Sequence, residues 1–345
     1  MSFLSDNREK HVSDIDFVVL WVDGDDPEWQ AEKAKFVGKT DDRNAVNRYR
    51  DANYFRYWFR AVEKYAPWVR KIHFVTWGHL PAFLNAEHPK LNIVNHTDFI
   101  PQKYLPTFNS VAIEMNIHRI PGLSERFVFF NDDLFLLRPH SETDFFIDGK
   151  PCLYAMEKPL PVNRKAETWV HIALNDICII NKHFYKAQVM KSHIGRFINR
   201  RYRWQENLRN YILYKLYPDY FLGFNILHSP SPILKSTLAL IWDKEPELLD
   251  NTCSHKFRDR EDVNQWLAVW WQIVSGVFEP RKPDHLNIDI ENRTIDRICT
   301  EIENQHHHSI CLNDPNPDLM LTELNERIKV SFQTILPEPS RFEKR

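Results

Sequence analysis

The stretch of sequence that decides the fold is Arg126-Phe127-Val128-Phe129-Phe130-Asn131-Asp132-Asp133-Leu134-Phe135-Leu136. The aromatic and β-branched residues before Asn131 predict a buried strand, which brings an amide and two adjacent carboxylates to its carboxyl end. Unpaired charges are costly to bury, so an acidic pair between apolar residues requires a compensating cation. Ligands of open α/β sheets bind at this end of the strands, and Mg²⁺ prefers carboxylate and phosphate oxygens. The pattern predicts a divalent metal site, with an ordinary polar turn as the alternative.

Three further apolar runs predict neighbouring strands. Residues 16–22 lead into the acidic loop Asp23-Gly24-Asp25-Asp26-Pro27, whose glycine and proline favour a tight turn. Runs at 71–76 and 91–94 follow, and residues 51–65 are expected to form a helix after the first run. Strands that alternate with helices predict an α/β fold, so we expect a Rossmann-like (GT-A-like), mostly parallel sheet flanked by helices.

Composition narrows the class of protein. The 345 residues can bury a large core in one domain or two, and a net charge of -2 gives no general attraction to nucleic acid. Five cysteines without CxxC pairing favour reduced thiols and a cytoplasmic location. Residues 1–16 are polar, so no signal peptide is expected, and no run approaches the roughly 20 apolar residues of a membrane span. With only 8 glycines and no glycine-rich loop, phosphate must be held by basic side chains, a metal or helix N-termini.

Basic side chains gather in two places. The first is 48–60, where Asp51 is a candidate helix N-cap and Arg56 and Arg60 share one helix face. The second is 254–262, followed by an aromatic helix expected at 263–274. Solvated helix surfaces and local ion pairs are the alternatives to ligand binding in both.

A single histidine stands out between these clusters. The segment Leu227-His228-Ser229-Pro230-Ser231-Pro232 fixes His228 on a rigid extended loop, ahead of a helix expected at 233–241. A lone histidine is more often structural than catalytic. However, imidazole titrates near neutrality, and a rigid loop suits a proton acceptor.

In four blocks the chain resembles the Stealth family, the bacterial capsular polysaccharide phosphotransferases related to the animal N-acetylglucosamine-1-phosphotransferase. The blocks are 16–25; 48–136, with Asp51, Arg56, Leu105-Pro106-Thr107-Phe108-Asn109-Ser110 and Asn131-Asp132-Asp133; His228-Ser229-Pro230; and His255-Lys256-Phe257-Arg258 with Glu261-Asp262. Two positions depart from the pattern: Tyr54-Phe55 replaces the usual Glu-Leu, and Trp77-Gly78 stands where many members have Asn-Gly. Residues 158–225 match no block.

The resemblance implies a transferase that moves hexose-1-phosphate, or N-acetylhexosamine-1-phosphate, from a UDP-sugar to a hydroxyl of a growing capsular or cell-surface glycan. The products would be a phosphodiester and UMP. Such a reaction is catalysed mainly by positioning and by stabilising charge on the phosphoryl oxygens. The implied partners are a nucleotide-sugar donor and a glycan acceptor. A chain acting on lipid-linked intermediates would associate peripherally with the inner face of the cytoplasmic membrane.

The resemblance also implies roles for single residues. Asp132 and Asp133 would hold Mg²⁺ or Mn²⁺ with support from Asn131, and His228 would be the general base, with Asp51 as the alternative base. The expected contacts to substrate are Arg56 and Arg258 as a clamp on the diphosphate, Arg48 beside them, Trp21, Asp23 and Gly24 at the nucleoside, Asn109 and Ser110 at the sugar or its phosphate, and His255 as a further candidate.

We expect four segments along the chain: a nucleotide-sugar-binding core at 14–157, a helical insert for acceptor or membrane contact at 158–226, the rest of the catalytic core at 227–280, and a tail with helical segments at 281–345. The insert interleaves basic and aromatic residues between Arg196 and Tyr220. A helix with aromatics inward and arginines outward is favoured there over a surface for an anionic glycan or a membrane.

Two other functions stay open at this stage. A metal-dependent glycosyltransferase of the GT-A type would use similar nucleotide-binding and acidic elements but release UDP. A non-catalytic glycan or sugar-nucleotide binding protein would release neither nucleotide. The basic and histidine blocks beyond residue 227 favour phosphotransfer over both.

Overall fold

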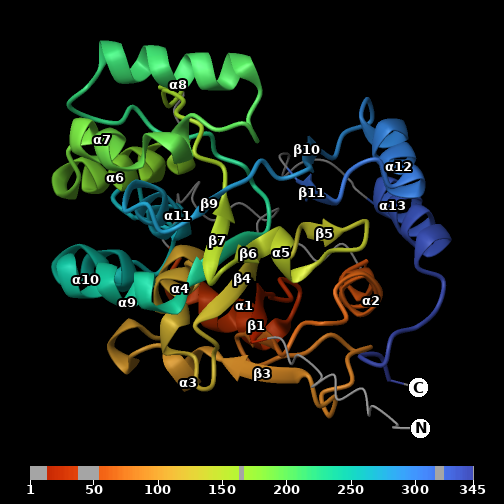
Figure 1. Ribbon diagram of the computed structural model, residues 1–345. Coiled ribbons are helices and arrows are strands. Elements are labelled where there is room, and N and C mark those ends of the chain that lie inside the picture. The colour runs from red at the N-terminus through yellow and green to blue at the C-terminus, as the bar shows by residue number, and fades with distance from the viewer. Residues whose placement is uncertain (1–13, 38–53, 163–166, 315–321, 345) are drawn as a thin grey trace, which may run out of the picture.

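A five-stranded sheet in the order β3-β2-β1-β4-β8 forms the centre of the computed structural model (Figure 1), which describes residues 14–37, 54–162, 167–314 and 322–344. The strands of this sheet are β1 Ile15–Leu20, β2 Ile72–Thr76, β3 Leu91–Asn95, β4 Arg126–Phe130 and β8 Ser231–Leu234. The first four are mutually parallel, and β1 lies between β2 and β4. The expected Rossmann-like, mostly parallel sheet is confirmed.

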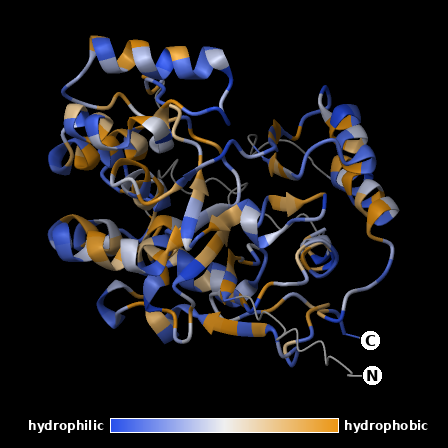
Figure 2. Ribbon diagram, viewed as in Figure 1, coloured by the Kyte–Doolittle hydropathy of each residue, from blue (hydrophilic) through white to orange (hydrophobic). Residues whose placement is uncertain are grey.

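Both faces of the sheet are covered, which explains why its strands are mainly apolar. Successive residues of β1 alternate between two cores: Phe17 packs in the core that contains α2 and α13, whereas Val18 packs in the core that contains α4, α9 and α11. Figure 2 shows the strands as largely hydrophobic ribbon. The helices are α1 Pro27–Ala34, α2 Arg56–Tyr65, α3 His96–Phe99, α4 Ser110–Asn116, α5 Glu142–Phe145, α6 Thr168–His183, α7 Lys186–Phe197, α8 Trp204–Leu216, α9 Lys235–Lys244, α10 Pro246–Ser254, α11 Gln265–Val274, α12 Ile295–Asn304 and α13 Thr322–Ile335, with short 3₁₀ turns at Gln102–Tyr104 and Ile117–Arg119.

Strand β8 corrects one expectation. A helix was predicted from residue 233, but residues 231–234 form an edge strand antiparallel to β4, and the helix α9 begins at Lys235. An edge strand tolerates Pro232, which has no N–H to donate. The side chain of Gln272 completes the pairing, since it accepts from the Leu234 N–H and donates to the Pro232 carbonyl.

Two small sheets connect the C-terminal segment to the core. Strand β11 (Ser309–Asn313) pairs in parallel with β10 (His285–Asp289) and antiparallel with β5 (Leu134–Leu136). The second sheet contains β6 (Phe146–Ile147), β7 (Lys150–Leu153) and β9 (Glu279–Pro280). The segment expected as a mainly helical tail therefore also supplies two strands, and one of them lies directly behind the acidic pair.

The extreme C-terminus is fixed by a buried ion pair. Arg60, which the sequence left as a candidate surface residue, donates to both carboxylate oxygens of Glu343 and to the Leu336 carbonyl. Its guanidinium is therefore part of the fold and not of a ligand site. No helix among the described residues is long and apolar enough to cross a membrane.

Candidate active site

The candidate site lies at the carboxyl edge of the sheet. Asn131, Asp132 and Asp133 follow β4 directly. Because β8 runs antiparallel to β4, with Ser231 opposite Phe129, the loop before β8 reaches this same edge. The reversal of one strand thus brings His228 to the acidic pair across about a hundred residues of sequence.

Asn131 and Asp133 contact the two nitrogens of His228. The Asn131 side-chain nitrogen lies 2.7 Å from His228 Nε2, and Asp133 Oδ2 lies 3.7 Å from His228 Nδ1. The Cys311 thiol of β11 donates to Asp133 Oδ2 at 3.3 Å and lies 3.3 Å from His228 Nδ1. Burial, reinforced by the Asp133 charge, raises the pKa of Cys311 well above its usual value, so the sulfur stays a neutral thiol.

The carboxylates of this cluster fit a hard divalent cation, whereas the neutral Cys311 thiol is not a ligand for one. The ligand atoms of Asp133, His228 and Cys311 all lie within 4.8 Å of one another. Asp133 Oδ1 is buried and has no hydrogen-bond partner among the described residues, although a buried carboxylate oxygen normally has one. Asp132 stands beside it, exposed, on the wall of the same cavity. A carboxylate oxygen without a protein partner is a ready ligand for Mg²⁺ or Mn²⁺.

Arg258 approaches the same cavity from the loop between α10 and α11. Its Nε and Nη2 atoms both donate to Ser110 Oγ, at 3.1 and 2.6 Å. Glu114, one helical turn after Ser110, is 3 % exposed, and burial raises its pKa against the opposing effect of Arg258. The guanidinium is thus held by the Ser110 hydroxyl and interacts electrostatically with Glu114, while it still faces the cavity.

One cavity of about 940 Å³ joins these groups. Its lining includes Trp21, Ser110, Asn131, Asp132, Asp133, His228 and Arg258 from the expected site, together with Glu114, Arg260 and His96. Burial lowers the pKa of His96 to about 4, so this imidazole is neutral. A cavity of this size accommodates a nucleotide-sized ligand.

The first strand end contributes mainly through Trp21. Its ring stacks on Phe55 at 6.4 Å between centroids and meets the His79 ring edge to face. Asp23 and Gly24 do not line the cavity, and their groups are used within the loop: the Asp23 N–H donates to His79 Nε2, and the Gly24 carbonyl accepts from Gln30. Asp23 and Gly24 therefore shape the loop beside Trp21.

Three other expected contacts lie outside the cavity lining. Arg56 begins α2 with its guanidinium carbon 5.2 Å from the centre of the Phe83 ring. Asn109 is fully buried as the N-cap of α4, and it donates to Asp262. His255 Nδ1 lies 2.6 Å from the same Asp262 carboxylate. Asn109 and His255 thus both fix the loop that carries Arg258. Two further expected site residues, Arg48 and Asp51, lie outside the described residues.

Sequence reasoning missed two residues of the cavity region. Cys311 belongs to no motif, and only the pairing of β11 with β5 reveals its contact with Asp133. Glu114 carries a weak signal, since it follows Ser110 by four residues and so shares a helix face with it. Burial alone distinguishes it from a surface glutamate.

The fold and this cavity define an α/β protein with an acidic, histidine- and arginine-containing site at the carboxyl edge of its sheet. Residues 13–41 match Stealth protein CR1, conserved region 1, and residues 48–152 match Stealth protein CR2, conserved region 2. The chain is 42 % identical to the capsular polysaccharide phosphotransferase WcwK of Streptococcus pneumoniae, over 96 % of this chain and 100 % of the relative. The chain belongs to the Stealth family, as its sequence blocks implied.

Two further relatives carry related names. The exopolysaccharide phosphotransferase cps2G of Lactiplantibacillus plantarum is 38 % identical, over 96 % of both chains. The receptor polysaccharide phosphotransferase WefC of Streptococcus oralis is 38 % identical, over 95 % of this chain and 99 % of its own. Among solved structures, the galactosyltransferase LgtC with donor and acceptor sugar analogues aligns over 94 % of this chain and 98 % of its own, but a TM-score of 0.34 and 10 % identity carry no argument.

Proposed function

We propose that this protein transfers a sugar-1-phosphate from a UDP-sugar to a hydroxyl of a growing cell-surface polysaccharide and releases UMP. The transferred group is a hexose-1-phosphate or an N-acetylhexosamine-1-phosphate. The observation that carries the proposal is the convergence of Asp133, His228 and Arg258 on one cavity. Full-length similarity to phosphotransferases of capsular, exo- and receptor polysaccharides supports the reaction class.

In this proposal the cation is held by Asp132 and Asp133. A bound Mg²⁺ or Mn²⁺ would neutralise charge on the diphosphate and so favour departure of the nucleotide phosphate. The buried, unpartnered oxygen of Asp133 supports this assignment. Asn131 then orients the site from the same turn, since its carbonyl accepts from the Leu134 N–H while its amide reaches His228.

Arg258 would act on the phosphate of the donor, and His228 would act on the hydroxyl of the acceptor. The Arg258 guanidinium binds the oxygens of the phosphate under attack, and the Ser110 hydroxyl keeps it in place. His228 takes the proton of the acceptor hydroxyl, which replaces the Asn131 amide at Nε2. The oxygen of that hydroxyl forms the new P–O bond as the P–O bond to UMP breaks. Trp21, which lines the cavity, contacts the nucleoside.

The runner-up is a metal-dependent glycosyltransferase, which breaks the sugar C–O bond instead. It would use the same acidic pair, base and guanidinium, but the acceptor would attack the anomeric carbon. Full-length similarity to proteins named phosphotransferases favours attack at phosphorus. The two reactions differ in the nucleotide that they release.

Product analysis therefore tests the proposal. The protein is incubated with Mg²⁺, an acceptor glycan and a panel of UDP-sugars, and the nucleotide is separated by chromatography. UMP with a glycan that gains the mass of a sugar phosphate is the expected outcome. UDP with a glycan that gains only a sugar would replace this proposal by the runner-up, and a bound but intact donor would leave a binding protein.

A further inference from the structure

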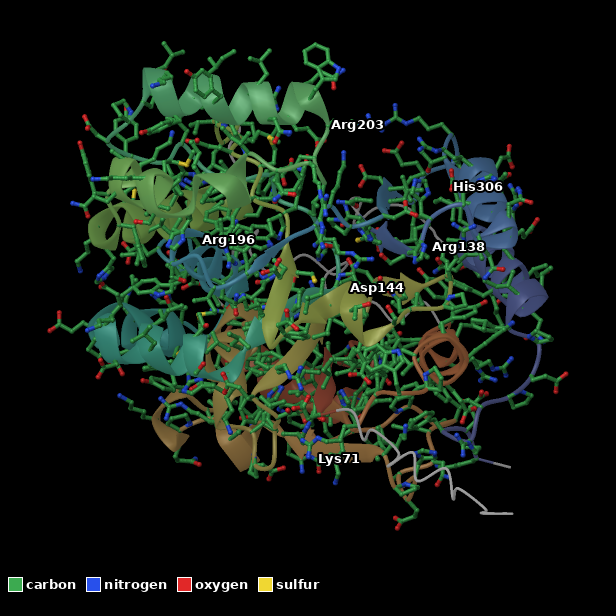
Figure 3. All side chains as sticks on the ribbon, in the orientation of Figure 1. Lys71, Arg138, Asp144, Arg196, Arg203 and His306 are labelled. Carbon is green, nitrogen blue, oxygen red and sulfur yellow. The ribbon has the colours of Figure 1, made fainter. Side chains whose placement is uncertain are left out.

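Helix α8 differs from an ordinary surface helix because its apolar residues face solvent. Its outward residues are the apolar ones, with Trp204 70 % and Leu216 65 % exposed. Leu208, Tyr211 and Ile212 lie on the same side by helical periodicity and are also exposed. The expectation that the aromatic residues of this insert point inward is wrong for α8. Figure 3 shows side chains that stand out from the free side of this helix, at the top of the view.

The side of α8 that faces the core is held in place by the hydrogen bonds of a polar residue, Asn210. Asn210 is 2 % exposed, donates to the carbonyls of Ala155 and Phe197, and accepts from the Glu157 N–H. The buried ion pair between Glu157 and Lys186 supports the same junction. Helix α8 is therefore anchored to the core by Asn210 and by the partly buried Tyr214, while Trp204, Leu208 and Leu216 remain exposed on its outer side.

The charge around this apolar side is positive. Arg209 and Lys215 are exposed on α8, and Arg203 is exposed as its N-cap residue. Lys215 projects between Tyr211 and Leu208 on the helical wheel. The single acidic residue of the helix, Glu206, is turned toward the core, where it accepts from Lys282. Asp219, just beyond the helix, accepts from the Tyr185 hydroxyl. Within α8 itself, an anionic partner thus meets no carboxylate among the exposed apolar residues.

We propose that α8 lies on the surface of a membrane that contains anionic lipids. Trp and Tyr rings prefer the boundary between headgroups and acyl chains, and basic residues bind lipid phosphates. This inference does not depend on the proposed reaction.

The insert that carries α8 also contributes to the wall of the cavity. Residues Lys158, Pro159 and Leu160, which lead into the insert, and Trp169 of α6 line the wall of the cavity. A membrane bound by α8 would hold this wall close to acceptors that are attached to lipid. A single interfacial helix binds reversibly, so the protein would exchange between membrane and solution.

Sedimentation with vesicles tests the proposal on the full-length protein. We expect the wild type to sediment with vesicles of phosphatidylcholine and phosphatidylglycerol in a 1:1 ratio, and to stay in solution with phosphatidylcholine alone. The triple variant Trp204→Ser/Leu208→Ser/Leu216→Ser should lose roughly tenfold or more in vesicle-bound fraction, because buried apolar area drives insertion. The control Leu240→Ser/Val330→Ser changes exposed apolar residues on α9 and α13 and should bind as the wild type does.

A second variant covers the charge. Arg203→Gln/Arg209→Gln/Lys215→Gln, which changes only exposed side chains, should weaken binding to anionic vesicles by roughly tenfold or more and reduce its salt dependence. Both variants should keep the wild-type melting temperature and the wild-type turnover of a water-soluble acceptor. Absence of wild-type binding to anionic vesicles would overturn the proposal. Binding of both variants at the wild-type level would overturn it as well. A wild-type dimer that the serine variant converts to a monomer, without any effect on vesicles, would assign the surface to self-association instead.

Discussion

Two aspartates at opposite ends of the central sheet have opposite surroundings. Asp16 in β1 is fully buried at the amino end, and it accepts from Arg70, His73 and the Ser124 N–H. Asp133 after β4 stands at the carboxyl end and has a buried oxygen with no partner among the described residues. Burial tends to raise the pKa of Asp16, but its hydrogen bonds outweigh this and lower the pKa.

The difference distinguishes a carboxylate that stabilises the fold from one that is available to a ligand. At the amino end the charge is neutralised by the protein itself, so Asp16 stabilises the fold and needs no ligand. At the carboxyl end the chain leaves charge and hydrogen-bonding capacity unused, and unpaired polar groups of this kind mark sites where a ligand completes the structure. Four predictions follow the contrast from the largest expected effect to the smallest.

Asp133→Asn should reduce turnover by about 10³-fold or more, because a neutral amide is a weak ligand for a divalent cation. The melting temperature should stay within about 2 °C of the wild-type value, since no ion pair to a fixed protein cation is lost. Steady-state kinetics and thermal unfolding measure the two quantities. The exposed control Asp243→Asn should change neither, and an unchanged rate for Asp133→Asn would remove this residue from the site.

His228→Ala should lower kcat by about 10² to 10³-fold while donor affinity changes little, as expected for a group that moves a proton. Binding of the UDP-sugar by calorimetry separates the two effects. His306→Ala, at an exposed histidine of the C-terminal region, is the matched control. Loss of thermal stability without a specific loss of kcat would instead show that the imidazole is structural.

Asp16→Asn should cost about 2 kcal/mol of folding free energy, less than the usual 3–5 kcal/mol for a broken buried pair, because the Arg70 side chain is 33 % exposed. The lowered pKa of Asp16 adds a pH dependence. Its contribution to stability is fully present above the unfolded-state pKa of about 3.9 and is lost as the pH falls through the lower folded-state pKa. Urea unfolding of wild type and variant between pH 3 and 7 measures both. A constant difference across this range would contradict the assignment.

Arg258→Lys should lower kcat/KM by about tenfold, because an ammonium cannot reproduce two parallel hydrogen bonds to a phosphate. The effect is smaller than that of Asp133→Asn because the positive charge remains. Initial rates at low donor concentration measure it, with Arg293→Lys as the exposed control. Equal rates for wild type and Arg258→Lys would place the guanidinium outside the reaction.

Local sequence was sufficient for the sheet and for the acidic turn. The mainly apolar runs at 16–22, 71–76, 91–94 and 126–130 coincide with strands β1, β2, β3 and β4, so these four strands can be predicted from adjacent residues. The direction of β8 could not be predicted, because antiparallel pairing of Ser231 with Phe129 depends on contacts between distant segments. The same limit hid Cys311, whose sequence neighbours show no sign of the site that it contacts.

The outward face of α8 was misjudged for a related reason. Aromatic and apolar residues at helical spacing predict which side is apolar but not which side meets the core. Here the buried Asn210 decides the orientation through three hydrogen bonds to neighbouring segments. A polar anchor of this kind is visible only after the segments have been placed together.

The most direct test of the central contrast is Mn²⁺ binding, followed by electron paramagnetic resonance in the presence of a UDP-sugar. The account predicts that the wild type and Asp16→Asn, studied below its melting temperature, bind the ion equally. Asp133→Asn should bind it at least about tenfold more weakly. Equal binding by Asp133→Asn and the wild type would contradict the claim that the carboxyl edge of this sheet is completed by a metal.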